Sequence, residues 1–285
     1  MLKHRLLFGA LMIVGFGSLV ILDGLLDGSL TASAPDKAVQ GTLLCILIAL
    51  LALPAQLELS KLAAAKNVRI FAPLGAVASI LLATTWYWPQ FTDISKEFYL
   101  PVVSALILPA LLLYQGVRFG ISGVLANCGA TLFAIYYLGI LSCFVLAIRI
   151  EFGLWELLMF VCVIKSSDIG AWAIGRKFGV HKFSPRISPG KTWEGMGGAV
   201  GASVLVAVLF AVFCGIMVWS AALVFGVFLA FVGQLGDLAE SMIKRDAGQK
   251  DSADKVPGFG GILDIIDSPL MAAPFAYLFF MFFAW

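Results

Sequence analysis

Charged residues are scarce in this sequence. Asp, Glu, Lys and Arg together make up 13% of its 285 residues, which is about half of the share that soluble domains carry. A soluble chain of this length needs a charged surface to cover its core, so the composition excludes a soluble enzyme and a disordered chain. The net charge of +2 is also too small to indicate a nucleic-acid partner.

Paired cysteines are missing as well. The five cysteines lie singly inside apolar runs, at Cys45, Cys128, Cys143, Cys162 and Cys214. None belongs to a CxxC pair, and none has a histidine nearby at metal-ligand spacing. This excludes a secreted disulfide scaffold and a cysteine-based zinc site, and it is typical of small apolar side chains that face lipid or other helices.

Long apolar runs recur from one end of the chain to the other. Each is long enough to cross ~30 Å of hydrocarbon, and each is continuously apolar rather than alternating, which favours helices over a porin-type barrel. No internal repeat favours an inverted-repeat transporter. We therefore expect an all-α, polytopic integral membrane protein with about nine transmembrane helices. They are expected near residues 5–22, 39–57, 70–88, 98–115, 120–147, 153–175, 193–214, 218–240 and 263–285.

The positions of the basic residues predict the orientation, because Lys and Arg gather on the cytoplasmic side of membrane proteins. With nine spans and a cytoplasmic N-terminus, only Lys37, Lys96 and Arg149 would lie outside, and Lys165 would lie inside a helix. We expect this orientation in the cell (inner) membrane, with the C-terminus facing outward. The apolar stretch 6–22 is long for a signal peptide, so we expect a retained first helix.

Composition divides the chain into two regions. Residues 1–150 are mostly apolar, with about five expected spans, whereas residues 151–285 hold nearly all the polar residues that need explaining, two basic loops and about four spans. We expect the second region to carry the chemistry. Whether the protein forms a homodimer stays an open question, because pairs of small residues four positions apart are too common in membrane helices to predict a dimer.

Two charged residues fall inside the sixth expected span. Lys165 and Asp168 are three residues apart, so they share a helix face. An unpaired charge within a membrane costs at least ~2.5–3.5 kcal/mol. One interpretation is a mutual ion pair that holds two helices together. We favour the other interpretation, a polar site inside the helix bundle that binds substrate.

A turn suited to phosphate follows this span, within the basic loop 175–195. Ser188, Pro189 and Gly190 directly precede Lys191 and an expected helix. Backbone N–H groups, the helix N-terminus and the lysine would then point the same way, which suits an anion. The spacing of a Walker A motif is absent. The alternative is a basic anchor that touches anionic lipid.

Carboxylates collect at the ends of the last two expected helices. Asp237 lies on a polar stripe near the end of the eighth span, and Asp264 and Asp267 are three residues apart at the start of the ninth. Three carboxylates at low dielectric cannot all stay ionised unaided. Because Mg²⁺ prefers oxygen ligands, we predict that these three aspartates hold Mg²⁺. The alternative is a solvated cluster neutralised by Lys and Arg. A metal site beside a basic surface, at headgroup depth, indicates phosphoryl or nucleotidyl transfer to a lipid.

Residues 241–267 resemble the signature of the CDP-diacylglycerol synthases (phosphatidate cytidylyltransferases). The matching residues are Ser241, Lys244, Arg245, Lys250, Asp251, Ala253, Pro257, Gly260, Gly261, Ile262, Asp264 and Asp267. The stretches KSSDIGAWAIGRKFG and SPRISPGKTWEG resemble upstream blocks of the same family, so the resemblance covers roughly 160–270. The sequence departs from the pattern at two positions: Phe259 stands where the family has His, and Ile265 stands where it has Arg.

The resemblance implies that CTP and phosphatidate react at the cytoplasmic face, with Mg²⁺, to give CDP-diacylglycerol and pyrophosphate. It adds Lys244 and Asp251 to Asp237 as catalytic candidates. The candidates for substrate binding are Lys191, Arg245, Lys250, Ser188, Gly190 and Asp168. The attacking phosphate oxygen is already ionised at neutral pH, so no strong base is needed and we expect activity to survive the loss of the family's His.

Three alternatives stay open. The first is another CTP-using membrane enzyme, such as a polyprenol or phytol kinase or a cytidylyltransferase for a different lipid phosphate. The second is an ion-coupled transporter that uses Lys165, Asp168 and Asp237 as a relay. The third is an inactive homologue that binds Mg-CTP without turnover, which the replacements at Phe259 and Ile265 make conceivable.

Overall fold

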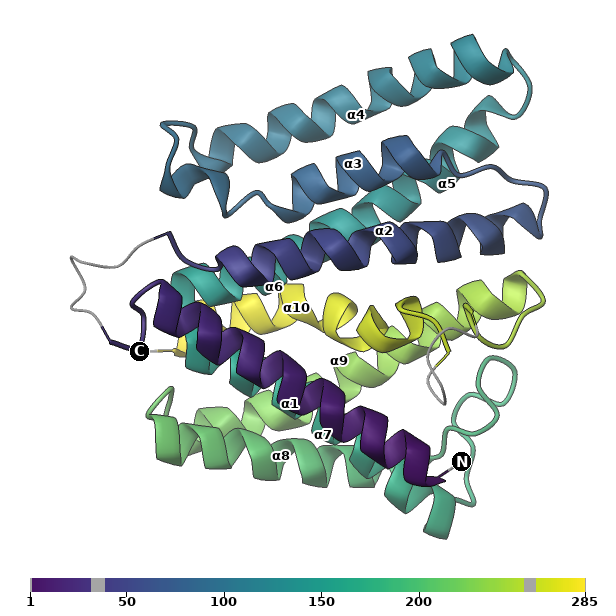
Figure 1. Cartoon of the computed structure of the whole chain (residues 1–285). Coiled ribbons are helices and arrows are strands. Elements are labelled where there is room, and N and C mark those ends of the chain that lie inside the picture. Colours follow the sequence, from purple (N-terminus) through teal and green to yellow (C-terminus); the bar gives the residue numbers. More distant parts are fainter. Residues whose placement is uncertain (1, 32–38, 254–259, 285) are drawn as a thin grey trace.

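The computed structural model describes residues 2–31, 39–253 and 260–284, with side chains from residue 11 onward (Figure 1). Within these ranges the chain is helical, apart from turns and a single β-bridge between Lys182 and Thr192. The helices are α1 (Leu2–Leu26), α2 (Thr42–Ala64), α3 (Ala72–Ala83), α4 (Lys96–Phe119), α5 (Val124–Ile135), α6 (Leu141–Ala147), α7 (Leu154–Phe178), α8 (Trp193–Cys214), α9 (Trp219–Asp246) and α10 (Leu263–Phe283).

Seven helical segments in the described part of the chain are long and apolar enough to cross a membrane. They are Thr42–Ala64, Lys96–Phe119, Val124–Phe152, Leu154–Phe178, Trp193–Cys214, Trp219–Asp246 and Leu263–Phe283. Two shorter apolar stretches, Leu11–Leu26 and Ala72–Ala83, coincide with the first and third expected spans. The expected all-α membrane fold is therefore confirmed, while a crossing by all nine segments stays a prediction.

The third of these segments is continuous but distorted. π-Helical turns at Tyr136–Ile140 and Ile148–Phe152 interrupt the α-helix between Val124 and Phe152. The first of these turns contains Gly139, where a Cβ atom would lie 2.9 Å from the carbonyl oxygen of Ser79 on α3. The glycine thus lets this helix and α3 approach each other closely.

Helix ends fall at residues that favour them. Ser95 and Thr192 cap α4 and α8, and their hydroxyls accept hydrogen bonds from backbone N–H groups of the first turn. Gly215 ends α8 with a φ of 66°, which is the left-handed conformation that favours glycine. Between such ends, each apolar segment must satisfy its backbone internally, and a helix does so.

The connections between helices separate to opposite ends of the bundle. At one end, Lys66 after α2 pairs with Asp246 at the end of α9, with 3.1 Å between Nζ and Oδ1. At the other end, Glu151 accepts hydrogen bonds from Trp86 after α3 and from Tyr277 near the end of α10. This separation is what alternating membrane spans require. Which end faces the cytoplasm stays a prediction.

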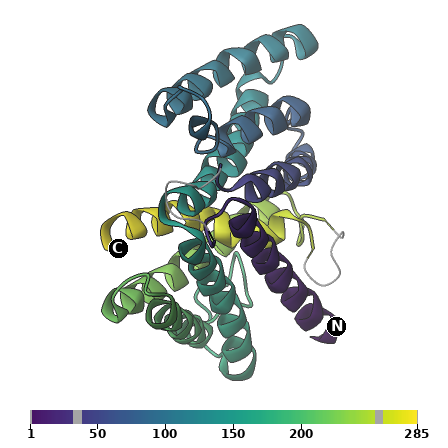
Figure 2. The same cartoon turned by 60° about the vertical axis from the view of Figure 1, so that its left-hand side comes forward.

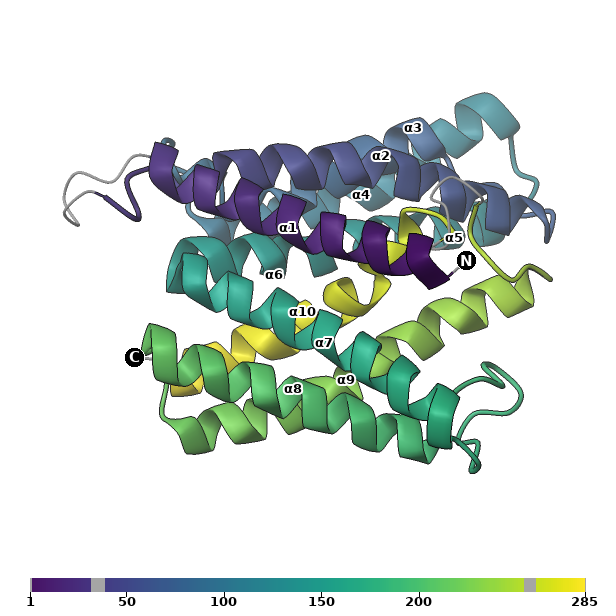
Figure 3. The ribbon, with the colours of Figure 1, turned by 60° about the horizontal axis from the view of Figure 1, so that its bottom comes forward.

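Helix α10 runs between the two regions of the chain. Figures 2 and 3 show α2 to α6 on one side of it and α7 to α9 on the other. It packs against α9, α6 and α7, and it also touches α2. Residues at its start can therefore contact side chains from both the first and the second half of the sequence.

From the positions of the basic residues, Arg149 was expected in an outer segment. In the structure its side chain is buried. Its guanidinium donates to Asp23 and Asp27 at the end of α1, over 3.2 Å and 2.5 Å, and all three side chains are almost inaccessible. A buried cation needs such partners. This triad fastens α1 to the end of the distorted helix.

Helices α7 and α8 approach most closely where two glycines meet. A Cβ atom on Gly170 would lie 2.3 Å from the carbonyl oxygen of Gly198, and one on Gly198 would lie 2.4 Å from that of Gly170. Small residues allow membrane helices to pack this closely. The same antiparallel packing brings Ser203 of α8 against α7, where its hydroxyl donates to the carbonyl oxygen of Val163 over 3.3 Å.

Replacing Gly170 with alanine should therefore destabilise the protein. The new methyl group overlaps the backbone of α8, and overpacking of this kind costs about 1–3 kcal/mol. Thermal unfolding in detergent should show a lower Tm. Gly201→Ala is the matched control, because a Cβ atom there meets nothing within 4 Å, so its Tm should equal or exceed that of the wild type. Equal melting of the two variants would contradict the glycine contact.

Candidate functional site

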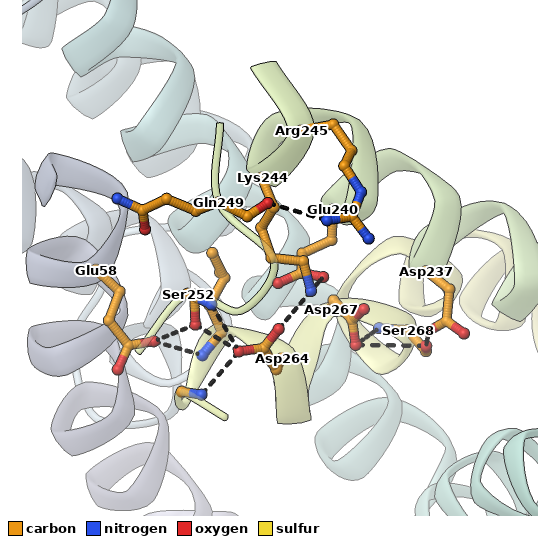
Figure 4. A network of polar contacts seen from close by, with 12 residues as sticks. Glu58, Asp237, Glu240, Lys244, Arg245, Gln249, Ser252, Asp264, Asp267 and Ser268 are labelled. Carbon is orange, nitrogen blue, oxygen red and sulfur yellow. Dashed lines mark hydrogen bonds and ion pairs between the residues drawn. The ribbon is translucent and has the colours of Figure 1, made fainter. Parts of the chain in front are cut away.

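Charged and polar side chains of α7, α9, α10 and the turn before α8 gather in one region, together with Glu58 of α2. Figure 4 shows the members that come from α2, α9, the loop after α9 and α10. They form two neighbouring groups. The Asp237 cluster consists of Lys165, Asp168, Lys191, Asp237, Asp267 and Ser268. The Lys244 cluster consists of Glu58, Glu240, Lys244, Ser252 and Asp264.

Lys191 joins the predicted phosphate turn to α9. The backbone of Lys191 closes the turn by donating to the carbonyl oxygen of Ser188, over 3.1 Å. Its ammonium lies 3.0 Å from Asp237 Oδ2 and donates to the carbonyl oxygen of Gln234 over 2.9 Å. The expected turn directly before a helix is thus formed, and its lysine reaches one of the expected carboxylates.

Ser268 connects the carboxylates of α9 and α10. Its hydroxyl donates to Asp237 Oδ1 over 2.5 Å, and its backbone N–H donates to Asp267 Oδ1 over 2.6 Å. Ser268 is fully buried and Asp267 is 4% exposed. This serine was not expected from the sequence, because nothing in the local pattern distinguishes it from other serines in apolar helices. Two of the three predicted metal ligands are nevertheless neighbours, as expected.

Lys165 and Asp168 belong to the same cluster. Lys165 Nζ lies 3.4 Å from Asp168 Oδ2 and donates to the carbonyl oxygen of Ile265 on α10, over 3.0 Å. Asp168 Oδ1 is buried and has no hydrogen-bond partner among the described residues. The two residues therefore form the ion pair that one interpretation required, yet they also leave a carboxylate oxygen available within a polar site.

Lys244 lies between two carboxylates. Its ammonium contacts Glu240 one helical turn earlier on α9 and Asp264 at the start of α10. The second oxygen of Asp264 accepts from the backbone N–H of Ser252, the hydroxyl of Ser252 and the N–H of Gly261, over 3.0, 2.7 and 2.7 Å. The lysine is 9% exposed, so its charge is largely shielded from water.

The predicted set of three metal-binding aspartates is divided by this arrangement. Asp264 is directed toward Lys244, whereas Asp237 and Asp267 meet at Ser268. Across the residues that the structure describes, no three His, Cys, Asp or Glu side chains are placed so that they could hold one metal ion. The three-aspartate site is therefore not formed as expected, because Asp264 is taken up by the Lys244 cluster.

The Asp237 cluster still offers the donors that Mg²⁺ prefers. Asp237 and Asp267 present carboxylate oxygens from neighbouring helices, and the unpartnered Oδ1 of Asp168 belongs to the same cluster. Hard oxygen ligands of this kind suit Mg²⁺. These residues fit the ion chemically, and metal binding by them stays a prediction.

Other predicted residues lie around the two clusters. Arg245 is exposed and donates to the carbonyl oxygen of Ile187, next to the phosphate turn, over 3.3 Å. Gly190 is exposed in that turn, and Lys250 and Asp251 are exposed in the loop after α9. Their roles stay predictions. Pro257 and Phe259, which figure in the family resemblance, lie outside the described residues.

Glu58 is the member of the Lys244 cluster that comes from α2, and it was not expected from the sequence either. Its carboxylate accepts from the N–H groups of Ile262 and Leu263, over 3.2 and 2.9 Å, and from the hydroxyl of Ser252, over 3.0 Å. It is fully buried. One signal could have identified it, since a carboxylate inside an apolar membrane segment is expensive and usually has a role.

The arrangement combines three lysines with carboxylates in a poorly hydrated place. Lys165, Lys191 and Lys244 lie inside or directly before apolar helices. Fixed charges at low dielectric stabilise a charged transition state more strongly than the same charges in water. The site is therefore suited to neutralising phosphate oxygens and aligning them.

Comparison with known proteins agrees with this chemistry. The sequence profile described as "Cytidylyltransferase family" matches residues 29–283. A phosphatidate cytidylyltransferase of Bacillus subtilis is 32% identical over 215 residues, which is 74% of this chain and 80% of that protein. Two further proteins of the same name, from Haemophilus influenzae and Brucella suis, are 39% and 44% identical over 135 and 137 residues.

The latter two matches are shorter. They cover 46% and 47% of this chain and span about half of each relative, 47% of the Haemophilus protein and 49% of the Brucella protein. The family profile extends over nearly the whole chain, and the family expected from the signature resemblance is confirmed. This chain belongs to the cytidylyltransferase family.

Proposed function

We propose that this protein transfers a cytidylyl group from CTP to phosphatidate, giving CDP-diacylglycerol and pyrophosphate. The observation that carries the proposal is the meeting of Lys191 with Asp237, and of Lys244 with Asp264, among apolar helices in a chain of this family. The relatives that bear the name phosphatidate cytidylyltransferase support this choice of substrates.

The reaction needs little acid–base chemistry from the protein. An ionised phosphate oxygen of phosphatidate attacks the α-phosphorus of CTP and forms a new P–O bond. The bond from that phosphorus to the oxygen bridging to the β-phosphate breaks, and pyrophosphate leaves with the electron pair. Alignment of the two phosphates and neutralisation of their charge therefore supply most of the acceleration.

The two clusters divide these tasks. Asp237 holds Lys191 at the end of the phosphate turn. In the proposed site, Lys191 binds phosphate oxygens together with the backbone of that turn. Arg245, exposed beside the same turn, binds the outer phosphates of CTP, with Lys250. Lys244, fixed between Glu240 and Asp264, neutralises charge near the reacting phosphorus.

Mg²⁺ is the proposed cofactor, held by Asp237 and Asp267 with Asp168 nearby. When bound, the ion supplies charge neutralisation at the reacting phosphate oxygens. The buried and unpartnered Asp168 Oδ1 supports this assignment, because a buried carboxylate oxygen without a partner is costly unless a ligand satisfies it. Asp264 serves instead to fix Lys244.

The lipid substrate reaches the site from the bilayer. The outer faces of the helices expose large apolar side chains, among them Leu113, Val117, Leu125 and Phe213, so the acyl chains of phosphatidate can remain in hydrocarbon. The basic loop before α8 lies at the same end of the bundle as both clusters. Because basic loops face the cytoplasm, we place the site at the cytoplasmic face of the cell (inner) membrane.

Isotope placement tests the proposed reaction. Purified protein in detergent, given phosphatidate, Mg²⁺ and CTP labelled at either the α- or the γ-phosphate, should place the α-label in lipid and the γ-label in pyrophosphate. Removal of divalent cations with EDTA should stop transfer, and added Mg²⁺ should restore it. Appearance of the γ-label in lipid would indicate a kinase instead. Binding of CTP without any labelled product would indicate an inactive homologue.

A further inference from the structure

Glu58 lies outside the region that carries the proposed chemistry. It belongs to α2, in the first half of the chain, and it is 204 residues before Ile262 in the sequence. Neither phosphate binding nor metal binding in the proposed reaction uses it. Its buried carboxylate nevertheless meets the start of α10 and the loop after α9 (Figure 4).

The first contact of Glu58 is with the N-terminus of α10. The opening N–H groups of a helix have no partners within the helix, and the N-cap residue Ile262 provides no side-chain cap. Glu58 accepts from the N–H groups of Ile262 and Leu263 over 3.2 and 2.9 Å. A carboxylate in this position also interacts favourably with the helix dipole. Glu58 therefore supplies from another helix the cap that α10 lacks.

The second contact of Glu58 leads to the lysine of the proposed site. The hydroxyl of Ser252 lies 3.0 Å from Glu58 Oε2 and 2.7 Å from Asp264 Oδ2. The other oxygen of Asp264 contacts the ammonium of Lys244. A continuous chain of polar contacts thus runs from α2 through Ser252 and Asp264 to Lys244.

The adjacent glycines provide an independent observation. A Cβ atom on Gly261 would lie 2.0 Å from Ser252 Oγ and 2.3 Å from Glu58 Oε2. Gly260 has a φ of +94°, and a Cβ atom there would lie 2.5 Å from Asp264 Oδ2. The glycine pair is needed because two carboxylates and a hydroxyl lie directly against this backbone. The loop is therefore shaped around Glu58 as well as around Asp264.

We propose that Glu58 is a positioning residue for the transfer reaction. It fixes the start of α10 and, through Ser252, holds Asp264 in the orientation that places the Lys244 ammonium. This inference rests on the proposed function, and it assigns to the first half of the chain a part in building the site of the second half.

The decisive variant is Glu58→Gln, which keeps the size of the side chain but turns one accepting oxygen into a donor that faces other donors. We expect kcat to fall about 10- to 100-fold, because small misplacements of catalytic groups have effects of this size. The KM for phosphatidate should change less than about threefold. Glu58→Asp keeps the charge with a shorter reach, and its kcat should be intermediate.

Gln115→Ala is the matched control. Gln115 lies on α4 in the same half, is 1% exposed, and loses hydrogen bonds to Gly120 and Ser122 when truncated. Its variant should melt at a lower temperature while each folded molecule keeps the wild-type kcat. Ser252→Ala removes the hydroxyl that joins Glu58 to Asp264 and leaves α2 unchanged. In the double variant, its effect on kcat should not add to that of Glu58→Gln.

Hydrogen–deuterium exchange adds a readout that does not need activity. Glu58→Gln should speed exchange in the peptide that covers 260–266, and Gln115→Ala should not. Wild-type kcat in Glu58→Gln, or unchanged exchange at that peptide, would overturn the inference. If the wild-type protein transfers no cytidylyl group while exchange responds as expected, the proposed function fails and the capping by Glu58 stands.

Discussion

Replacing Asp267 with asparagine should lower the rate of cytidylyl transfer about 100- to 1,000-fold, the range seen when one electrostatic group is removed from an active site. Asp267 is almost fully buried and is joined to Asp237 through Ser268. The amide keeps an oxygen for the Ser268 N–H but carries no negative charge and is a weaker ligand for Mg²⁺. Initial rates with α-labelled CTP, measured in detergent micelles that contain phosphatidate, provide the test.

Asp246→Asn is the control for this experiment. Asp246 ends α9, the helix that carries Asp237, but its side chain is 75% exposed and pairs only with Lys66 in the described structure. Exposed ion pairs contribute about 0–1 kcal/mol, so this variant should retain nearly the wild-type rate and Tm. Near-normal turnover by Asp267→Asn would remove Asp267 from the reaction and with it the proposed metal site.

Lys244→Met should abolish transfer and also destabilise the fold. The lysine is held between Glu240 and Asp264, and all three side chains are largely buried. Its loss leaves two neighbouring carboxylates without their cation, and breaking a buried ion pair from one side costs about 3–5 kcal/mol. A clear drop in Tm in detergent should accompany the loss of rate.

A double variant separates these two effects. Lys244→Met combined with Glu240→Gln removes the cation together with one of its two carboxylates, so less uncompensated charge stays buried. Its Tm should recover part of the way toward the wild type. Transfer should stay undetectable, because no ammonium remains beside Asp264. Recovery of transfer in the double variant would show that Lys244 acts only in stability.

Much of the architecture could be predicted from local sequence. Each of the nine apolar segments expected from the sequence overlaps a helix of the structure, and the turn before α8 lies where Pro189 and Gly190 predicted it. A backbone in hydrocarbon must satisfy its own hydrogen bonds, so an apolar run of sufficient length specifies a helix without information from elsewhere. The family resemblance likewise depended on a local pattern and is confirmed by the family profile.

The composition of the site was predictable only in part. Lys191 and Asp237 were expected to serve phosphate and metal, and the structure brings them into contact. Asp264 and Asp267 were expected to act together because they share a helix face. One of them turns to Lys244 and the other to Ser268, since helical spacing gives direction only approximately and neighbouring helices decide which partner a side chain meets.

The sequence by itself determined the helical membrane fold, the concentration of charge in the second half and the family, because each follows from residues near one another in the chain. Only the tertiary structure decided that Glu58 caps α10, that Ser268 joins two aspartates and that Arg149 is buried with Asp23 and Asp27. Two of these contacts join residues more than 100 positions apart, and all three depend on which helix faces meet. Helix packing decides such contacts, and no local pattern of residues records them.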